Sequence, residues 1–474
     1  MTHKVYDAVV IGAGPNGLAA AVALAQAQRS VLLVEARAEL GGGTRSAELT
    51  LPGYLHDVCS GVHPLGVLSP FLRTLPLEQH GLRWLHADVS AAHPLDDGRA
   101  LLLERSLSAT AAQLGVDERA YARLFEPLLR DPDTLLSDLL GPLRIPRGPI
   151  AFTRFGLRGM RSAVGLANGL FRDAGAKALF AGCAAHAILP LDKLFTAAVG
   201  LLFLLTGHVQ NWPVAQGGSQ AIARALASYF ASLGGEVTTS LRVERLDQLP
   251  QARAYLFDLA PRQLVDIAGD ALPHGYRQRL LRYRYGPAVW KLDFALAGPI
   301  PWRAVECARA STVHLGGTLE EIAASERAAW RGEVTQRPFV LVCQQSHFDA
   351  TRAPAGKHTG YAYCHVPHAG TFDMSAAIEQ QIERFAPGFR DLILARRAWS
   401  PADLERENAA HVGGVIAGGA ADITQLFTRP VARWNPYSTP NPRIFLCSAA
   451  TPPGGGVHGM CGYHAARAAL KVLA

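Results

Sequence analysis

The chain of 474 residues carries a formal net charge of +7 at pH 7. With 49% hydrophobic and 18% charged residues, the composition excludes a disordered chain and predicts a globular protein of two or three domains around a large core. A basic balance can reflect nucleic-acid binding. The arginines, however, are spread along the chain without an aromatic–basic recognition motif, so we expect no nucleic-acid partner.

The cysteines and the N-terminal residues indicate the cellular compartment in which we expect the protein. The seven cysteines form no C-x-x-C pair, which argues against a dithiol redox centre and a zinc ribbon, and no metal site is expected. An odd, scattered set is typical of reduced thiols in the cytosol. Asp7 interrupts the first apolar run, so no signal peptide is predicted and we expect a cytoplasmic protein.

The first fifty residues carry the strongest pattern in the sequence. A β-rich run at 5–11 leads into Gly12-Ala13-Gly14-Pro15-Asn16-Gly17, which matches G-x-G-x-x-G. An Ala- and Leu-rich helical stretch at 18–25 follows, and a second apolar run at 30–34 ends on Glu35. This order of strand, glycine turn, helix, strand and acid predicts a dinucleotide site. The alternative is a glycine-rich turn without a ligand.

Each position of this motif has a physical role. Gly12 permits the tight turn out of the strand, Gly14 lets a pyrophosphate reach the backbone, and Gly17 lets the helix pack closely on the sheet. The helix N-terminus offers free N–H groups and the positive end of its dipole to the phosphates. Glu35 is placed to accept hydrogen bonds from ribose hydroxyls.

A second glycine cluster, Gly41-Gly42-Gly43-Thr44-Arg45-Ser46, follows the acidic residue. A long, two-headed flavin cofactor needs backbone close to its phosphates and a cation near them, and Gly42, Gly43, Thr44 and Arg45 are expected to supply both. Glu35 disfavours a 2′-phosphate by like-charge repulsion. We therefore predict that the cofactor is FAD.

Residues 141–172 combine positive charge with apolar side chains, and no acidic residue lies between Asp138 and Asp173. This composition suits a membrane surface. The alternative, which we favour, is a solvated, partly mobile flap over the substrate site. The arginines concerned are Arg144, Arg147, Arg154, Arg158, Arg161 and Arg172.

The most lipid-like segment runs from 187 to 206. Its uninterrupted apolar part, 194–205, is too short to span a bilayer, and Asp192 and Lys193 precede it. We therefore expect a buried helix that lines a cavity.

Residues 213–270 are expected to return to the nucleotide-binding part of the chain. The pattern predicts a helix over 221–233 and buried strands at 236–239 and 254–260. Leu241-Arg242-Val243 continues the strand pattern, and Val243 is expected beside the cofactor.

Alternating apolar and polar positions mark the region from 276 to 400. We expect a mostly antiparallel sheet that includes 288–296, 339–343 and 360–364, with a helix at 375–385.

The tail is expected to return to the cofactor. A strand at 443–448 is followed by the glycine-rich run 451–459 and by a helix at 462–473. A triple glycine at a helix start indicates backbone close to a ligand, so Gly455, Gly456 and Val457 are candidate flavin contacts. The helix dipole, aimed at the N1–C2=O edge, would stabilise an anionic reduced flavin.

These elements predict an α/β fold. A Rossmann-like FAD-binding domain, which resembles that of the glutathione-reductase-type flavoproteins, is interleaved with an α+β substrate domain that contains a mostly antiparallel sheet. The FAD-binding domain is expected over 1–75, 213–275 and 440–474, and the substrate domain over 76–212 and 276–439.

The sequence resembles the phytoene dehydrogenase-related FAD oxidoreductases over nearly its whole length, and especially the branch of pyridine nucleotide-disulfide oxidoreductase domain-containing protein 2. The resemblance implies non-covalent FAD and an oxidoreductase role. It implies no disulfide chemistry here, because the chain has no thiol pair. The residues that carry it are Gly12–Gly17 with Glu35, 41–46, 217–226, 285–296, 399–427 and 447–463.

Candidate catalytic residues are few. Lys291 lies in a run similar to the amine oxidase strand whose lysine holds a water at flavin N5. The alternative is a structural ion pair, because Lys291 and Asp293 lie on one strand face. His56 and His458 are candidates because they lie beside cofactor loops. Other histidines that could line the site are His63, His365 and His368.

We expect a hydride to be taken from a C–C or C–N bond of a largely apolar small molecule, with oxygen or a quinone as electron acceptor. One rival is a flavin amine oxidase with an aromatic cage from Tyr437 or Trp434. Another is a non-catalytic lipid carrier similar to Rab GDP-dissociation inhibitors, which the intact Gly14, Glu35 and 454–456 argue against. A membrane surface, contacted peripherally through residues 141–172, is a further possible partner.

Overall fold

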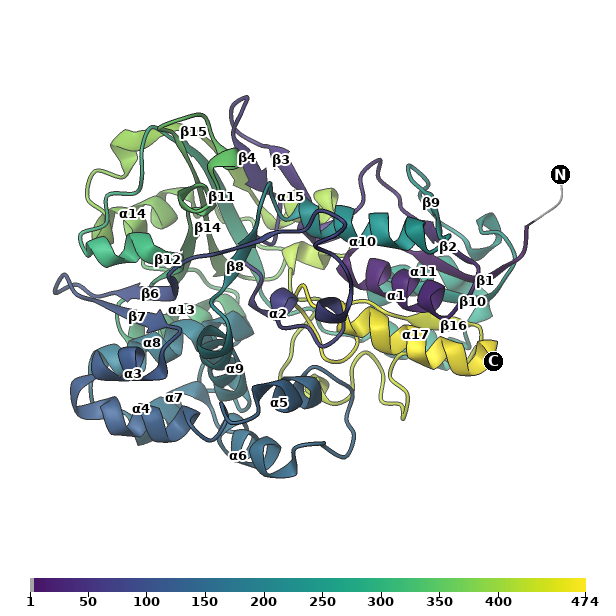
Figure 1. Ribbon diagram of the computed structural model, residues 1–474, viewed down its shortest axis with the longest axis horizontal. Helices are drawn as coiled ribbons and strands as arrows, with labels where there is room; N and C mark the ends of the chain where they lie inside the picture. Colours follow the sequence, from purple (N-terminus) through teal and green to yellow (C-terminus); the bar gives the residue numbers. More distant parts are fainter. Residues whose placement is uncertain (1–3) are drawn as a thin grey trace.

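A five-stranded parallel sheet forms one end of the molecule in the computed structural model, which describes residues 4–474 (Figure 1). All four strand pairings are parallel. In sheet order the strands are β16 (Ile444–Leu446), β10 (Ala252–Phe257), β1 (Tyr6–Ile11), β2 (Val31–Val34) and β9 (Glu236–Thr238).

Helices cover both faces of this sheet, which explains why most residues of its central strands are apolar and buried. Alternate residues of β1 take opposite sides: Ala8 and Val10 join one core cluster, Val9 and Ile11 the other. The first face carries α1 (Pro15–Gln26), α10 (Gln220–Ser232) and α17 (Met460–Leu473). The second carries α11 (Pro261–Ala268) and α12 (His274–Leu281).

A seven-stranded sheet forms the other end, and its pairings are antiparallel except that of β12 with β6. Its order is β15 (Ile393–Trp399), β11 (Ala288–Leu296), β14 (His358–Val366), β13 (Val340–Cys343), β12 (Ala310–Leu315), β6 (Val89–Pro94) and β7 (Ala100–Glu104). The predicted mostly antiparallel sheet is confirmed.

One face of this sheet packs against α14 (Ser375–Phe385). The opposite face packs against a helical layer. That layer comprises α3 (Leu107–Ala112), α4 (Glu118–Phe125), α5 (Pro132–Leu139), α6 (Pro149–Gly159), α7 (Ala163–Leu170), α8 (Ala174–Ala184), α9 (Thr196–Val209) and α13 (Leu319–Arg331).

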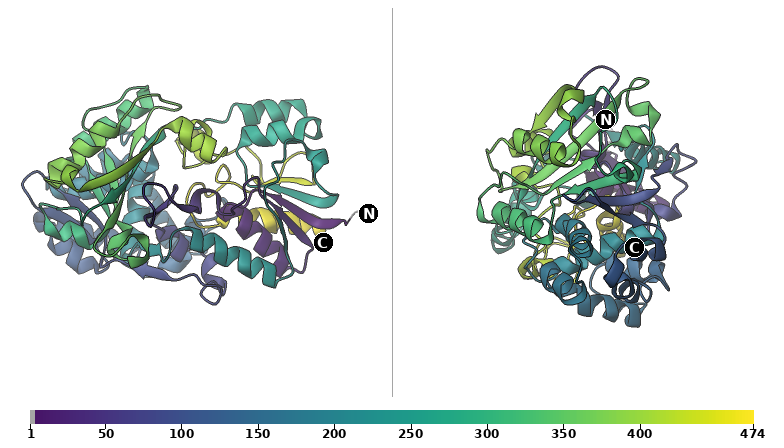
Figure 2. Two further views of the ribbon diagram at one scale, coloured as in Figure 1. Left: turned by 90° about the horizontal axis from the view of Figure 1, so that it is seen from above. Right: turned by 90° about the vertical axis from the view of Figure 1, so that its left-hand side faces the viewer.

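The two ends are linked by segments that run between them, including the stretch that follows β2 (Figure 2). Two ribbons lie along this route: β3 (Ser46–Glu48) with β4 (Leu55–Asp57), and β5 (Trp84–His86) with β8 (Pro213–Ala215). Because the parallel sheet draws strands from 6–34, 236–257 and 444–446, the predicted interleaved α/β architecture is confirmed. The domain limits remain predictions.

From Thr196 onward the apolar segment at 187–206 lies in α9, whose Val199, Leu202 and Phe203 line the main cavity, so the predicted cavity-lining helix is confirmed. No helix within residues 4–474 is long and apolar enough to cross a bilayer.

The predicted strand at Leu241-Arg242-Val243 is wrong. The chain turns at Ser240, whose φ is 57°, and the Leu241 N–H donates to the Glu35 carbonyl at 3.0 Å. The segment therefore crosses the carboxyl end of β2 instead of extending β9, and this crossing brings Val243 to the cavity.

Candidate functional site

One cavity of about 1140 Å³ joins the two ends of the molecule. At the parallel sheet it is lined by the glycine turn after β1, by Glu35 and by the loop before α17. At the seven-stranded sheet it is lined by α9, Thr312, Leu341, Tyr361 and Tyr363. Ligands of open α/β sheets bind at the carboxyl ends of the strands, which is where this cavity begins.

The glycine turn has no room for side chains. Gly12 has a φ of +95°, and a Cβ on Gly14 would lie 2.6 Å from Asp258 Oδ2. A Cβ on Gly17 would lie 1.9 Å from the Gly12 carbonyl oxygen, although Gly17 itself packs behind the cavity wall. The N-cap residue Gly14 has no side chain, Pro15 has no N–H, and the Gly17 N–H donates to Asp258 Oδ2 at 2.8 Å, which leaves the Asn16 N–H at the start of α1 for an anion. This cradle fits the pyrophosphate of a dinucleotide.

Glu35 lines the cavity at the end of β2. Its Oε2 accepts a hydrogen bond from the Ala13 N–H at 2.8 Å, and its Oε1 accepts one from the Arg37 N–H at 3.0 Å. A carboxylate offers about four lone pairs. The backbone thus fixes the carboxylate and leaves acceptor capacity for a ribose diol.

The second glycine cluster is partly in the wall. Gly42, Gly43 and Arg45 line the cavity, whereas Thr44 is buried and donates to the Gly41 carbonyl at 2.8 Å. The Arg45 guanidinium lies 2.7 Å from a carboxylate oxygen of Glu407. Arg45 therefore links the glycine cluster at 41–46 to the segment that contains Glu407. The Glu407 carboxylate neutralises much of the positive charge of Arg45.

The loop before α17 contributes Gly455, Gly456, Val457 and His458. Burial lowers the pKa of His458 to about 4, so its ring is neutral. Nδ1 accepts from the Met460 N–H at 3.0 Å, which places the ring proton on Nε2. Within residues 4–474 this buried N–H has no acceptor. This N–H is available to a ligand or to a bound water.

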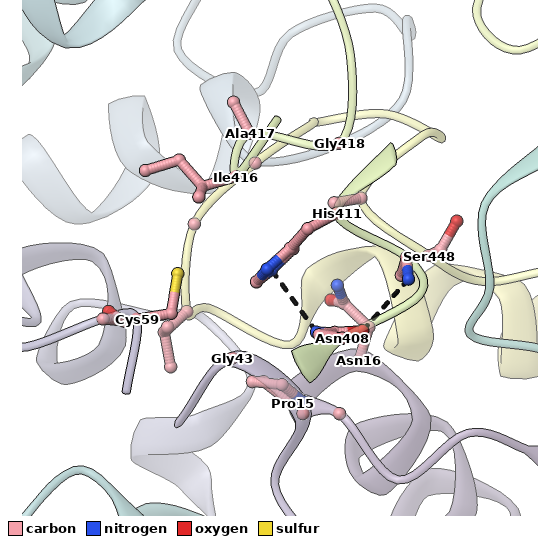
Figure 3. A pocket seen from close by; sticks show the side chains of 18 of the residues that line it. Pro15, Asn16, Gly43, Cys59, Asn408, His411, Ile416, Ala417, Gly418 and Ser448 are labelled. Carbon is pink, nitrogen blue, oxygen red and sulfur yellow. Dashed lines mark hydrogen bonds between the residues drawn. The ribbon is translucent and has the colours of Figure 1, made fainter. Parts of the chain in front are cut away.

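Asn408 and His411 line the cavity and were not found from the sequence (Figure 3). The two residues are joined by hydrogen bonds, with 3.3 Å between Asn408 Nδ2 and His411 Nε2. His411 Nε2 also lies 3.7 Å from the position of a Cβ on Gly43. Their segment, within 399–427, carries the family resemblance, but no short motif in it points to these two residues.

Lys291 and His56 lie behind the cavity wall. Lys291 is buried, forms an ion pair with Asp293, and has its Nζ 4.6 Å from the ring centre of Tyr361, which does line the cavity. Trp399 Nε1–H donates to Asp293 at 2.8 Å. Lys291 and Asp293 thus form a buried ion pair, which is the alternative to a catalytic role for Lys291.

His56 belongs to the same buried group. Its Nδ1 lies 3.7 Å from Asp293 Oδ1, and its Nε2 lies 2.8 Å from Thr50 Oγ1. Burial lowers the pKa of His56 to about 4. Both ring nitrogens are thus directed at protein groups, not at the cavity.

The far end of the cavity is an apolar chamber. No Asp, Glu, Lys or Arg belongs to this part of the described wall. Its lining residues are His186, Ala187, Ile188, Val199, Leu202, Phe203, Trp212, Thr312, Leu341, Cys343, Tyr361 and Tyr363.

The aromatic cage expected from Tyr437 or Trp434 is absent from the described wall. Trp434 is fully exposed, and Tyr437 is buried with its hydroxyl donating to the Pro452 carbonyl at 3.1 Å. Tyr361 and Tyr363 supply the aromatic lining instead. They come from alternate positions of one strand, β14, and therefore share a face of the sheet.

The cysteines form no reactive pair. All seven are buried and none is disulfide-bonded. Cys59 reaches the cavity wall, and burial raises its pKa to about 11. No cluster of metal-ligating side chains occurs in the part of the chain that the structure describes.

Comparison with known proteins identifies relatives. Residues 10–74 match the NAD(P)-binding Rossmann-like domain. Pyridine nucleotide-disulfide oxidoreductase domain-containing protein 2 of Mus musculus is 28% identical, with 99% of this chain and 94% of the relative covered. A lycopene-forming phytoene desaturase of Pseudescherichia vulneris is 25% identical over 60% of this chain and 62% of the relative.

Solved structures share the fold. An oxidoreductase from Methanosarcina mazei has a TM-score of 0.67 and 16% identity, covering 98% of this chain and 99% of its own. Putrescine oxidase bound to putrescine has a TM-score of 0.62 and 17% identity, with 99% of each chain covered. The resemblance to the phytoene dehydrogenase-related proteins is therefore confirmed.

Proposed function

We propose that this chain, an oxidoreductase of the superfamily that contains the phytoene desaturases and amine oxidases, binds FAD and takes a hydride from a C–C or C–N bond of a largely apolar small molecule. The observation that carries the proposal is the continuity of one cavity from the glycine cradle to an uncharged chamber. The cradle suits a dinucleotide, and the chamber suits an apolar substrate.

FAD, when bound, supplies a two-electron acceptor for hydride. The chain's own residues bind it, exclude water and hold the substrate. The titratable groups of the chamber are neutral near pH 7, because burial raises the pKa of Cys343 to about 12 and lowers that of His186 to about 3, and it also raises the pKa values of Tyr361 and Tyr363. Since no charged base lines the chamber, the residues there act by positioning and desolvation.

The uncharged chamber also favours a neutral substrate over a cationic amine. A diamine such as the putrescine in the oxidase structure carries positive charge, and burying a charge without a partner is costly. We therefore propose a dehydrogenase or desaturase reaction, with oxygen or a quinone as the electron acceptor.

The test is anaerobic reduction of the purified protein. We expect a yellow protein whose flavin absorbance is lost on addition of an isoprenoid or acyl compound from a panel that also contains amines. Returning oxygen or a soluble quinone should restore the colour and identify the acceptor. A colourless protein would contradict the cofactor assignment, and bleaching by amines alone would favour amine oxidation.

Peripheral membrane contact through 141–172 is a second proposal, which a specific surface supports. Leu143, Ile145, Ile150 and Leu157 expose more than 60% of their side chains. Arg154 and Arg158, on the same helix α6 as Ile150 and Leu157, form no ion pair within residues 4–474. Apolar side chains flanked by free cations suit an anionic bilayer, at on the order of 1 kcal/mol for each cation.

Cosedimentation with phosphatidylglycerol vesicles tests this contact. We expect binding at low salt that weakens at high salt and in Arg154→Gln/Arg158→Gln. Arg279→Gln, on α12, is the matched control and should bind as the parent does. Equal binding by both variants, or none by the parent, would leave α6 as part of a solvated flap.

A further inference from the structure

Among the described residues that line the apolar chamber, His186 is the one histidine. It follows α8 and stacks on Phe203 with ring centres 4.3 Å apart, while Trp212 meets it edge-on at 5.8 Å. These contacts fix the plane of the imidazole. A polar ring held in place among apolar neighbours is a candidate anchor for a polar atom of the substrate.

A second buried imidazole supports this ring. His314, on β12, is fully buried, and its Nε2 lies 3.0 Å from His186 Nε2. Burial lowers the pKa of both rings, that of His186 to about 3, so both are neutral and a single proton lies between them. The direction of this hydrogen bond decides which group His186 presents to the cavity.

The surroundings of His314 decide that direction. Its Nδ1 packs against Gly182, where a Cβ would lie 2.7 Å away, and this nitrogen has no partner among the described residues. Among buried backbone groups, an N–H without an acceptor is rarer than an unsatisfied carbonyl, and we apply the same preference to the nitrogens of this ring. The proton of His314 therefore resides on Nε2 and is donated to His186 Nε2, which leaves the proton of His186 on Nδ1.

We infer that His186 is a substrate-binding residue: its Nδ1–H donates a hydrogen bond to a neutral acceptor oxygen, such as a ketone, ester or ether oxygen, of the otherwise apolar substrate, and His314 is the positioning residue that fixes this tautomer. No hydrogen bond to Nδ1 of His186 occurs within residues 4–474, and His186 lines the cavity, so this N–H is open to a ligand. The absence of charged residues from this wall argues for a neutral acceptor over a carboxylate.

This inference rests on the proposed function, because it names the substrate class of the same cavity. The inferred hydrogen bond from His186 favours a substrate that carries an oxygen atom over a pure hydrocarbon. A hydrocarbon would leave the His186 N–H buried and unpaired, which a binding site disfavours.

The probes are dipentyl ketone and undecane, which have similar shape and differ by one carbonyl oxygen. Calorimetric titration of the flavin-loaded protein gives the ratio of their affinities. We expect His186→Phe, which keeps the aromatic stacking, to lower the preference for the ketone about two- to tenfold. Comparing this ratio between variants cancels the different cost of removing the two probes from water.

Two variants of His314 test the positioning role. His314→Leu removes the donor and should lower the ketone preference, whereas His314→Gln keeps a donor and should preserve it. His347→Phe, at an exposed histidine beside Phe348, is the matched control. The carbonyl stretch of bound ketone should lie at lower frequency in the parent than in His186→Phe, which a purely structural role would not produce.

Equal affinity ratios in the parent and His186→Phe, or a carbonyl band unchanged between them, would overturn the inference. Flavin content is measured on every sample. A protein without flavin contradicts the proposed function, whereas a flavin-loaded protein that binds both probes without a shifted carbonyl band contradicts only the role of His186.

Discussion

The two ends of the cavity are built from different parts of the polypeptide. At the nucleotide end, glycines, backbone N–H groups and one helix terminus form the cradle, and side chains such as Glu35, Asn408 and His411 complete the wall around it. In the chamber, side chains from β12, β13, β14 and α9 form it. Side-chain substitutions leave the backbone-built cradle largely unchanged, whereas they alter the shape and polarity of the chamber directly. The comparison teaches that cofactor and substrate specificity are separable in this molecule.

Gly14→Val tests the backbone-built end most severely. The new side chain would enter the space beside Asp258 Oδ2, 2.6 Å from the Cβ position, and would block the approach of a pyrophosphate. We expect loss of essentially all copurifying flavin, measured as flavin released per polypeptide. Gly275→Ala is the control, because a Cβ there meets nothing within 4 Å. Stoichiometric flavin in Gly14→Val would show that the cradle is not the binding site.

Lys291→Met tests the layer of side chains behind the chamber. The substitution leaves the Asp293 carboxylate buried without its cation, so we expect the free energy of unfolding to fall by about 3–5 kcal/mol. Urea unfolding measures the loss, with the exposed Lys357→Met as control. Flavin reoxidation should stay unchanged. Normal stability with slowed reoxidation would instead assign Lys291 the catalytic role suggested by the amine oxidase strand.

Glu35→Ala should have a smaller effect at the nucleotide end. The ribose would lose hydrogen bonds to a charged acceptor, which weakens FAD binding by about 1.5–3 kcal/mol. Titration of the flavin-free protein with FAD measures this change, and Glu39→Ala, on the exposed loop after β2, is the control. Unchanged FAD affinity in Glu35→Ala would mean that the backbone alone holds the ribose.

Asp258 adds a titratable group to the nucleotide end of the cavity, where backbone groups otherwise form the cradle. Burial, with the nearby Glu35 charge, raises its pKa to about 7, although the Gly17 N–H donates to it at 2.8 Å. Cys447 and Cys461 are the other titratable groups near it. Since the folded pKa is raised, the protonated form is favoured below pH 7 and the carboxylate appears above it.

We therefore expect FAD affinity to fall, by less than about tenfold, as the pH rises from about 6 to about 8, because the carboxylate repels the pyrophosphate. Asp258→Asn should remove this dependence while keeping an acceptor for the Gly17 N–H. FAD titrations of both proteins across this pH range decide the point. The same slope in Asp258→Asn would assign the titration to another group.

Local patterns predicted the elements whose signals lie within a few residues. The strand at 288–296 and the helix at 375–385 have the predicted bounds, because their apolar periodicity matches their burial. The predicted strand at 241–243 failed because the turn at Ser240 requires a positive φ, which no residue preference signalled there.

The candidate site was predictable only where the backbone builds it. The glycines and Glu35 act through local geometry, which a motif records. His186 and His314 meet across 128 residues of sequence, and the Arg45 side chain bonds to Glu407 across 362. Such pairs form only when distant elements pack, so single-sequence patterns cannot identify them.

The interleaved strand order also has a kinetic consequence for cofactor loading. The cavity wall needs the turn at 12–14, the segment at 241–243 and the loop at 455–458, which are hundreds of residues apart in the chain. Contacts of this separation form slowly, since loop closure precedes any gain from packing. During synthesis the glycine turn emerges first but waits for the loop before α17. Under the proposed function, flavin insertion is then a late event, because the loop before α17 is the last part of the cavity wall to be synthesised.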